Sequence, residues 1–323
     1  DYTGGGCPHI LAEPQRTNQI LNSNDISLLN NVTAGDGVVS KTANYALSPD
    51  GTQNATRVVA SSTGSNYALI SSTAVSSTSG DYVGSVYLKS NNGSNQNVAL
   101  YGRSIVSYVT ITPNWERYSV VASGSSSFLN LGSRTSYGSD SSLDFLAWGI
   151  QIEHGSYATS LIPTSGSSVT RNQDQFSRDG ISSLINSTEG VFFGELNFGQ
   201  IDSAARYISV SDGTTNNRAI FGIEANESKI RYYFSNGGSL VVNKNYLLTD
   251  ISIFNKIAIK WKENDFALWL NGVEVASVTS GSTPSAGTFN KLNFTSGGSS
   301  QRFNGKVKQL QVYDTALTDM QLI

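Results

Sequence analysis

The stretch Trp148-Gly149-Ile150-Gln151-Ile152-Glu153-His154-Gly155 decides how this chain is divided. Apolar and polar side chains alternate as far as Glu153, which is the period of a half-buried β-strand. The strand meets a turn at Gly155, and a Ser/Thr-rich connector that contains Pro163 and Gly166 follows it. The pattern predicts that one β-domain ends here and that a second domain begins beyond the connector.

The composition predicts an all-β chain of two domains. The 323 residues are about two domains' worth, at roughly 150 residues per domain. Charged residues make up 14% and aromatic residues 10%, with a formal net charge of -3. A nucleic-acid surface needs clustered Lys and Arg, and a membrane-spanning helix needs about 18 apolar residues in a row. The sequence has neither, so we expect no nucleic-acid partner and no membrane insertion.

The first half of the sequence predicts a β-sandwich. From Ile20 to Glu153 short apolar runs, such as 82–88 and 98–101, alternate with turn residues such as those at 91–95. About nine strands at this spacing are typical of a sandwich. Because the chain opens on Asp1 without a Met, we also expect it to be a fragment or a processed form of a longer protein.

The pattern restarts after the connector and predicts a second sandwich. A buried strand is indicated at 191–198, and Asn271-Gly272 joins the alternating runs 266–270 and 273–275. Asn-Gly between two such runs is the strongest short-range signal of a β-hairpin, because both central residues need positive φ. A long alternating run at 303–313 closes the domain.

The stretch at residues 148–155 resembles a segment of bacteriophage tail and virion-surface proteins. The resemblance continues through Ala158-Thr159-Ser160-Leu161-Ile162-Pro163-Thr164 and Thr170-Arg171, and residues 13–18 resemble the beginning of the same module. It implies a tail-fibre or virion-surface fragment, located on the outside of the particle, with other fibre subunits as partners. Such fibres are commonly homotrimers.

Two further resemblances concern the folds. Residues 49–56 and 115–118 resemble jelly-roll carbohydrate-binding modules, whereas 261–272 and 303–319 resemble concanavalin-A-like, laminin-G-type sandwiches. They imply a jelly-roll domain at 17–158 and a concanavalin-A-like domain at 179–323, with a leading segment at 1–16 and a linker at 159–178. In the second fold one of two curved sheets is concave and often binds glycans.

The sequence holds no recognisable catalytic set, and we predict that the chain is not an enzyme. Nucleophilic catalysis needs a base beside the nucleophile, but the two histidines are His9 in the leading segment and His154 at a strand end. Glycoside hydrolysis needs two carboxylates, and no Glu-x-Asp-x-Glu strand occurs. One cysteine, Cys7, and two distant histidines give no zinc ligand set.

Aromatic residues are the predicted carbohydrate-binding groups, because their rings stack on the apolar face of a sugar while polar groups reach its hydroxyls. Trp115, Trp148 and Trp261 are assigned to the cores instead. For each candidate the alternative is ordinary packing in a core or at its rim. The candidates in the first domain are Tyr67, Tyr101, Arg103, Tyr108 and Tyr137, and those in the second are Tyr232 and Trp269.

The resemblance to jelly-roll modules also implies a structural calcium ion. Asp50 and Asp144 lie near the positions that hold it. Oxygen ligands scattered along a chain suit calcium. The alternative is that both are ordinary turn and strand-edge aspartates.

Together these observations predict a non-catalytic phage fragment that binds glycans on the host surface. Two alternatives stay open at this stage. One is that the chain is the accessory carbohydrate-binding region of a polysaccharide-degrading enzyme, and the other is that it is a structural spacer without a ligand.

Overall fold

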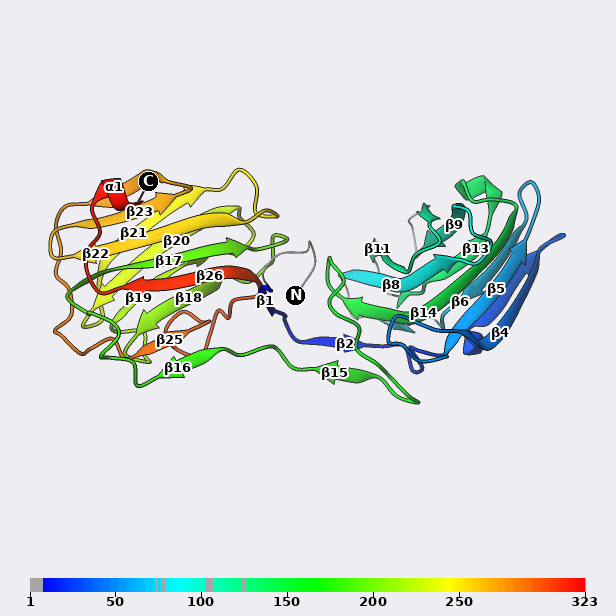
Figure 1. Cartoon of the computed structure of the whole chain (residues 1–323), viewed down its shortest axis with the longest axis horizontal. Helices are drawn as coiled ribbons and strands as arrows, with labels where there is room; N and C mark the ends of the chain where they lie inside the picture. Colours follow the sequence, from blue (N-terminus) through cyan, green and yellow to red (C-terminus); the bar gives the residue numbers. More distant parts are fainter. Residues whose placement is uncertain (1–7, 74, 77–79, 103–106, 124–125, 323) are drawn as a thin grey trace. The chain divides into compact units, whose positions relative to one another are not determined.

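The computed structural model describes residues 8–73, 75–76, 80–102, 107–123 and 126–322 (Figure 1). Its contacts divide the chain into two compact units. The first sandwich is Gln15–Asn172, and the second sandwich is Gln173–Ile323 together with the start of the chain up to Pro14. Both are built almost wholly from antiparallel strands, so the predicted all-β class of tandem sandwiches is confirmed.

Two five-stranded sheets form the first sandwich, and their inner faces enclose a core that includes Val86, Leu131 and Phe145. One sheet has the order β10 (Tyr108–Ile111), β9 (Gln96–Tyr101), β13 (Asn130–Ser133), β6 (Tyr67–Ser71), β3 (Asn30–Ala34). The other has the order β11 (Glu116–Ser123), β8 (Asp81–Ser90), β14 (Ser142–His154), β5 (Ala55–Ser61), β4 (Val38–Ala46). A separate two-stranded pair joins β7 (Val75–Ser76) to β12 (Ser126–Ser127).

Strand β14 contains residues 148–154 of the opening stretch, and two polar side chains there are buried as well as the apolar ones. Gln151 and Glu153 are both 0% exposed, so the expected half-buried alternation is wrong for this part of the strand. The reason is that residues 159–164 fold back over it. Thr159 donates to Glu153 from both its backbone N (2.8 Å) and its Oγ1 (2.6 Å), and the backbone N of Ile162 donates to Gln151 Oε1 (2.7 Å).

The predicted boundaries differ from the observed units at both ends of the first sandwich. Strand β15 (Val169–Arg171) pairs with β2 (Arg16–Asn18), so much of the predicted linker is part of this sandwich. Strand β1 (Ile10–Ala12) of the leading segment pairs with the last strand of the second sandwich. Backbone and buried polar groups need hydrogen-bond partners, and these partners come from segments distant in sequence.

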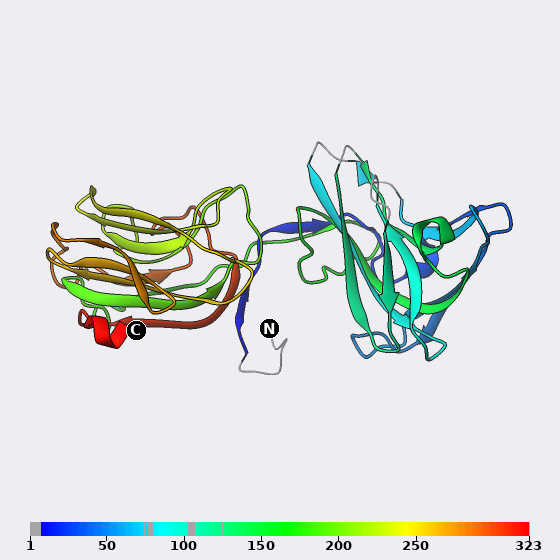
Figure 2. The same cartoon turned by 90° about the horizontal axis from the view of Figure 1, so that it is seen from above.

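Two six-stranded sheets form the second sandwich (Figures 1 and 2). Its core includes Phe192, Phe221, Phe234 and Trp261, and Ala12 of β1 joins it. The first sheet has the order β1, β26 (Gly305–Tyr313), β17 (Glu189–Asn197), β22 (Asn255–Lys262), β23 (Phe266–Leu270), β24 (Val273–Val278). The second has the order β16 (Ser177–Asp179), β25 (Lys291–Asn293), β18 (Arg206–Ser211), β19 (Arg218–Ile223), β20 (Lys229–Asn236), β21 (Ser239–Leu247).

Helical structure is limited to short pieces. They are the 3-10 turns η1 (Ile26–Leu28) and η2 (Thr135–Tyr137) and the four-residue helix α1 (Asp319–Leu322), which follows β26 (Figure 1). In the part of the chain that the structure describes, no helix has the length and apolar character needed to cross a membrane. The turn η2 carries Tyr137, which packs on Arg134, and the helix α1 carries Gln321 and Leu322, which line a hollow of the second sandwich.

Candidate functional site

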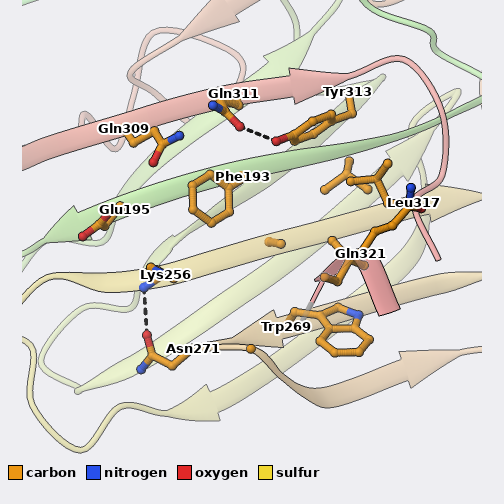
Figure 3. Close-up of a pocket in the computed structure, with 14 residues that line it drawn as sticks. Phe193, Glu195, Lys256, Trp269, Asn271, Gln309, Gln311, Tyr313, Leu317 and Gln321 are labelled. Atoms are coloured by element: carbon orange, nitrogen blue, oxygen red, sulfur yellow. Dashed lines mark hydrogen bonds between the residues drawn. The ribbon is translucent and has the colours of Figure 1, made fainter. Parts of the chain in front are cut away.

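A hollow of about 360 Å³ lies on the outer face of the first sheet of the second sandwich (Figure 3). This face carries a small apolar cluster of its own, separate from the core, formed by Val191, Ala258, Ala267 and Trp269. The hollow is lined by residues of strands β17, β22, β23 and β26, of the hairpin after β23 and of the C-terminal segment. The lining residues are Val191, Phe193, Glu195, Lys256, Ala258, Trp269, Asn271, Gly272, Gln309, Gln311, Tyr313, Leu317, Gln321 and Leu322.

The register of the sheet places four of these residues in one row. Gln311 pairs with Phe193, Phe193 with Ala258, and Ala258 with Trp269. Paired residues of neighbouring antiparallel strands share a face, so the small Ala258 lies between the two aromatic side chains. Two strand spacings separate Phe193 from Trp269, which is roughly 9–10 Å between their backbones. The hollow is therefore an apolar floor bounded on two sides by aromatic rings.

Trp269 lies where a binding residue was predicted, but it is only 5% exposed. Leu317 and Leu322 pack against the cluster to which it belongs. Its Nε1 is buried and has no hydrogen-bond partner among the described residues. An unsatisfied buried donor costs about 1–3 kcal/mol, so an acceptor that reached this indole N–H would stabilise it. The more accessible ring belongs to half-buried Phe193, which sequence reasoning missed.

Polar side chains form the rim of the hollow. The Asn271 side chain is fixed, because its Oδ1 accepts from the backbone N of Lys256 (2.8 Å). Tyr313 donates its hydroxyl hydrogen to Gln311 Oε1 (Figure 3), which leaves the amide hydrogens of Gln311 to other acceptors. The rim thus offers amide, hydroxyl and ammonium groups around an apolar floor.

One carboxylate, Glu195, occurs among the described residues that line the hollow. It is 8% exposed, and Lys308 Nζ donates to its Oε1 at 2.6 Å. An ionised carboxylate paired with an ammonium group is a structural ion pair and an acceptor for nearby hydroxyls. The lining therefore lacks the second carboxylate that glycosidic hydrolysis needs.

Tyrosines that sequence analysis singled out in the first sandwich come together around a residue that it missed. Tyr67, Tyr101 and Tyr137 surround Arg134, whose Cζ lies 5.1, 5.6 and 3.9 Å from their ring centroids. The group lies on the outer face of the β10–β9–β13–β6–β3 sheet, over a small apolar cluster separate from the core. We call these four residues the tyrosine–arginine cluster.

The cluster is held by direct contacts. Tyr101 and Tyr137 meet edge to face at 4.9 Å between ring centroids, and Arg134 Nη1 donates to the Tyr101 hydroxyl oxygen at 2.9 Å. Burial raises the pKa of Tyr101, so the phenol stays neutral and accepts this hydrogen bond at physiological pH. Tyr108 lies at the edge of the same face with half of its surface exposed. Arg103, also predicted here, lies outside the described residues.

Tyr232 is not a binding residue. It is 1% exposed, and its hydroxyl donates to the backbone oxygen of Lys260 at 2.8 Å. It pairs with Phe221 on β19 and belongs to the core of the second sandwich. Burial raises the pKa of its phenol well above the usual value. The prediction was wrong because the sequence does not reveal which of two alternating faces is covered by the other sheet.

The two predicted calcium ligands, Asp144 and Asp50, each accept hydrogen bonds from other side chains of the chain. Arg57 donates to both carboxylate oxygens of Asp144, at 2.8 and 2.7 Å, and lowers the pKa of that group. Asp50 closes a turn by accepting from Ser48 and Thr52, and the Ser48 hydrogen bond contributes most to lowering its pKa to about 2. Among the described residues no group of three His, Cys, Asp or Glu side chains could hold a metal ion. Both carboxylates are thus engaged by groups of the chain itself, as the alternative of ordinary turn and strand-edge aspartates implies.

Known structures resemble parts of the chain at low identity. The sialidase CBM40 module of Ruminococcus gnavus, bound to α2,3-sialyllactose, is 18% identical, with a TM-score of 0.38 over 46% of this chain and 90% of that one. The tandem CBM22 domain of Paenibacillus barcinonensis Xyn10C is 13% identical, with a TM-score of 0.31 over 92% of this chain and 98% of that one. Domains LG4-5 of the mouse laminin α1 chain are 10% identical, with a TM-score of 0.30 over 75% of this chain and 86% of that one.

No curated protein matches the sequence. Residues 196–322 match the family described as the concanavalin A-like lectin/glucanases superfamily. These residues include most strands of the second sandwich and many of the residues that line its hollow. The predicted concanavalin-A-like, laminin-G-type character is therefore confirmed for this part of the chain.

Proposed function

We propose that this chain binds glycans and that the hollow of the second sandwich is the binding site. The observation that carries the proposal is the row in which Phe193 and Trp269 flank Ala258, with an unpartnered buried indole N–H and a rim of amides. A pyranose has an apolar face of C–H groups and a perimeter of hydroxyls. An aromatic floor with polar groups at its edge complements both.

The binding that we propose is non-catalytic. Hydrolysis of a glycosidic bond uses two carboxyl groups about 5–9.5 Å apart on either side of the bond. The lining residues supply Glu195, which is paired with Lys308. A single paired carboxylate supports recognition of a hydroxyl and gives no acid–base pair for cleavage.

Filling the floor of the hollow tests the site directly. The change Ala258→Leu places a larger side chain between the two rings without removing any polar group, and we expect it to abolish binding of the glycan identified on an array. The change Trp269→Phe keeps most of the packing but removes the indole donor, and we expect affinity to fall about tenfold, equivalent to 1.4 kcal/mol. Isothermal titration calorimetry gives both values.

The matched control is Val273→Ala, a change of an exposed residue beyond the hairpin. It should bind like the unmodified chain, and all variants should keep the same circular dichroism spectrum. Wild-type affinity in folded Ala258→Leu protein would exclude the hollow as the site. An array without any bound glycan would instead favour the alternative of a structural spacer.

A more specific proposal is that the chain is a phage tail-fibre or virion-surface fragment, assembled as a homotrimer with other fibre subunits. The resemblance of residues 148–171 to such proteins supports it. We expect a threefold mass by light scattering and inhibition of phage adsorption by the purified chain. A monomer that inhibits no adsorption, with a catalytic domain encoded next to it, would favour the accessory region of a polysaccharide-degrading enzyme.

A further inference from the structure

Arg134 carries a positive charge that no carboxylate balances within the described part of the chain. Its neighbours are the three tyrosine rings of the tyrosine–arginine cluster, and the nearest lies 3.9 Å from Cζ. Aromatic faces stabilise a guanidinium through cation–π attraction, but they leave its net charge in place. A cation held in this way attracts an anion from outside the chain.

The hydrogen bonds of Arg134 leave one particular edge of the guanidinium without a partner among the described residues. Nη1 donates to the hydroxyl of Tyr101. Nε is buried without a hydrogen-bond partner, and Nη2 makes no hydrogen bond to a described residue. The N–H groups of Nε and Nη2 point in parallel from the same edge of the planar group. That edge matches the two oxygens of a carboxylate.

In the same sandwich, the corresponding edge of the Arg57 guanidinium is paired with a carboxylate. Its Nε donates to Asp144 Oδ1 at 2.8 Å, and its Nη2 donates to Asp144 Oδ2 at 2.7 Å. At Arg134 the two corresponding nitrogens have no such acceptor. The two arginines therefore differ in whether the chain itself provides the carboxylate.

The turn that follows Arg134 packs against an exposed tyrosine ring. Gly138 ends the turn η2 with φ 87°, and a Cβ there would lie 2.6 Å from Cδ1 of Tyr108. The Tyr108 ring thus packs directly on the turn that carries Tyr137, while half of its surface stays exposed. An arginine cation and an exposed ring on the same face of the sheet suit a ligand that has both a carboxylate and an apolar face.

We propose that the tyrosine–arginine cluster binds an acidic sugar of the uronic acid class, whose carboxylate pairs with Nε and Nη2 of Arg134. The sugar ring then lies against Tyr108. The inference rests on the proposed function of glycan binding, but it assigns a second site in the other sandwich with a different ligand chemistry. A carboxylate bound at this edge also gives the buried Nε its missing hydrogen-bond partner. The same contact therefore contributes to affinity and selects acidic over neutral sugars.

The test uses the whole chain and a panel of oligosaccharides that end in glucuronate or galacturonate, each beside its neutral methyl ester. We expect at least one acid to bind, its ester to bind roughly ten- to a hundredfold more weakly, and Arg134→Gln to reduce acid binding by a similar factor. Arg134→Lys keeps the charge but loses the paired donors, so it should give an intermediate affinity. Affinity for the acid should also fall with added salt.

Two controls separate this site from the hollow. The double change Arg57→Gln with Asp144→Asn removes the internal pair without leaving an unmatched charge, and it should bind the acid normally. Ala258→Leu should also leave acid binding intact, which distinguishes a failure here from a failure of the hollow. The inference is overturned if no acid binds more tightly than its ester, if folded Arg134→Gln keeps full affinity, or if a sulfated sugar binds as tightly as the best acid.

Discussion

The change Asn18→Ala is expected to lower the free energy of unfolding of the first sandwich by about 3–5 kcal/mol. The Asn18 side chain is 0% exposed and joins three segments of the chain. Its Nδ2 donates to the backbone oxygens of Ile150 (3.4 Å) and Ile162 (2.9 Å), and its Oδ1 accepts from the backbone nitrogens of Ile20 (3.1 Å) and Ile152 (3.2 Å). Alanine leaves all four groups buried without these partners.

Hydrogen exchange measured by mass spectrometry locates the effect. Peptides from Gln15–Asn172 should lose protection, whereas those from Gln173–Ile323 should keep it. The matched control is Asn31→Ala in the same sandwich, because the Asn31 side chain is exposed and makes one long hydrogen bond to Val39 (3.4 Å). Equal losses in the two variants would show that the Asn18 contacts add nothing beyond an ordinary surface asparagine.

The second large effect is expected for Arg206→Ala in the second sandwich, with a loss of about 3–5 kcal/mol from the cavity and the unsatisfied carbonyls. Arg206 is 1% exposed. Its guanidinium donates to the backbone oxygens of Phe198 (2.9 Å), Gln200 (2.5 Å) and Asn304 (3.2 Å). It therefore ties the segment after β17 to the segment before β26, next to the strands that form the hollow.

Denaturant unfolding, followed by tryptophan fluorescence, measures this loss, since Trp261 and Trp269 both lie in the second sandwich. Arg302→Ala is the control, because Arg302 is partly exposed and its hydrogen bond from Nε to the backbone oxygen of Ser299 is long at 3.3 Å. We expect that change to cost under about 0.5 kcal/mol. An Arg206→Ala midpoint equal to that of Arg302→Ala would mean that the buried guanidinium is dispensable.

The local sequence pattern was sufficient to predict the strands, but it did not predict how deeply each residue is buried. Trp148 and Trp261, assigned to cores from sequence, are 6% and 0% exposed. Trp115, assigned in the same way, is half-buried at the edge of the first sandwich, where its Nε1 donates to the backbone oxygen of Leu47 (3.1 Å). A residue's neighbours in sequence indicate a strand, whereas its burial depends on whatever packs on that face.

The predicted sites show the same division. Tyr67, Tyr101 and Tyr137 were chosen one by one as aromatic residues near strand ends, and the fold gathers them around Arg134. Arg134 itself had no distinguishing neighbour in the sequence. One available signal was its position three residues before Tyr137, between a short buried strand and the turn η2. Asp144, one of the two predicted calcium ligands, pairs with Arg57, which lies 87 positions away along the chain and which local pattern could not connect to it.

The sequence by itself determined the all-β class, the two sandwiches and hairpins such as the one at Asn271-Gly272, because period-two alternation and positive-φ turn residues act over a few positions. Only the tertiary structure decided that Phe193, Ala258 and Trp269 share one row and that Arg134 faces outward among tyrosines. It also decided that the residues after the opening stretch fold back onto it through Gln151 and Glu153. These contacts depend on pairing and register between strands that are far apart in the chain, whereas local pattern acts over a few positions only.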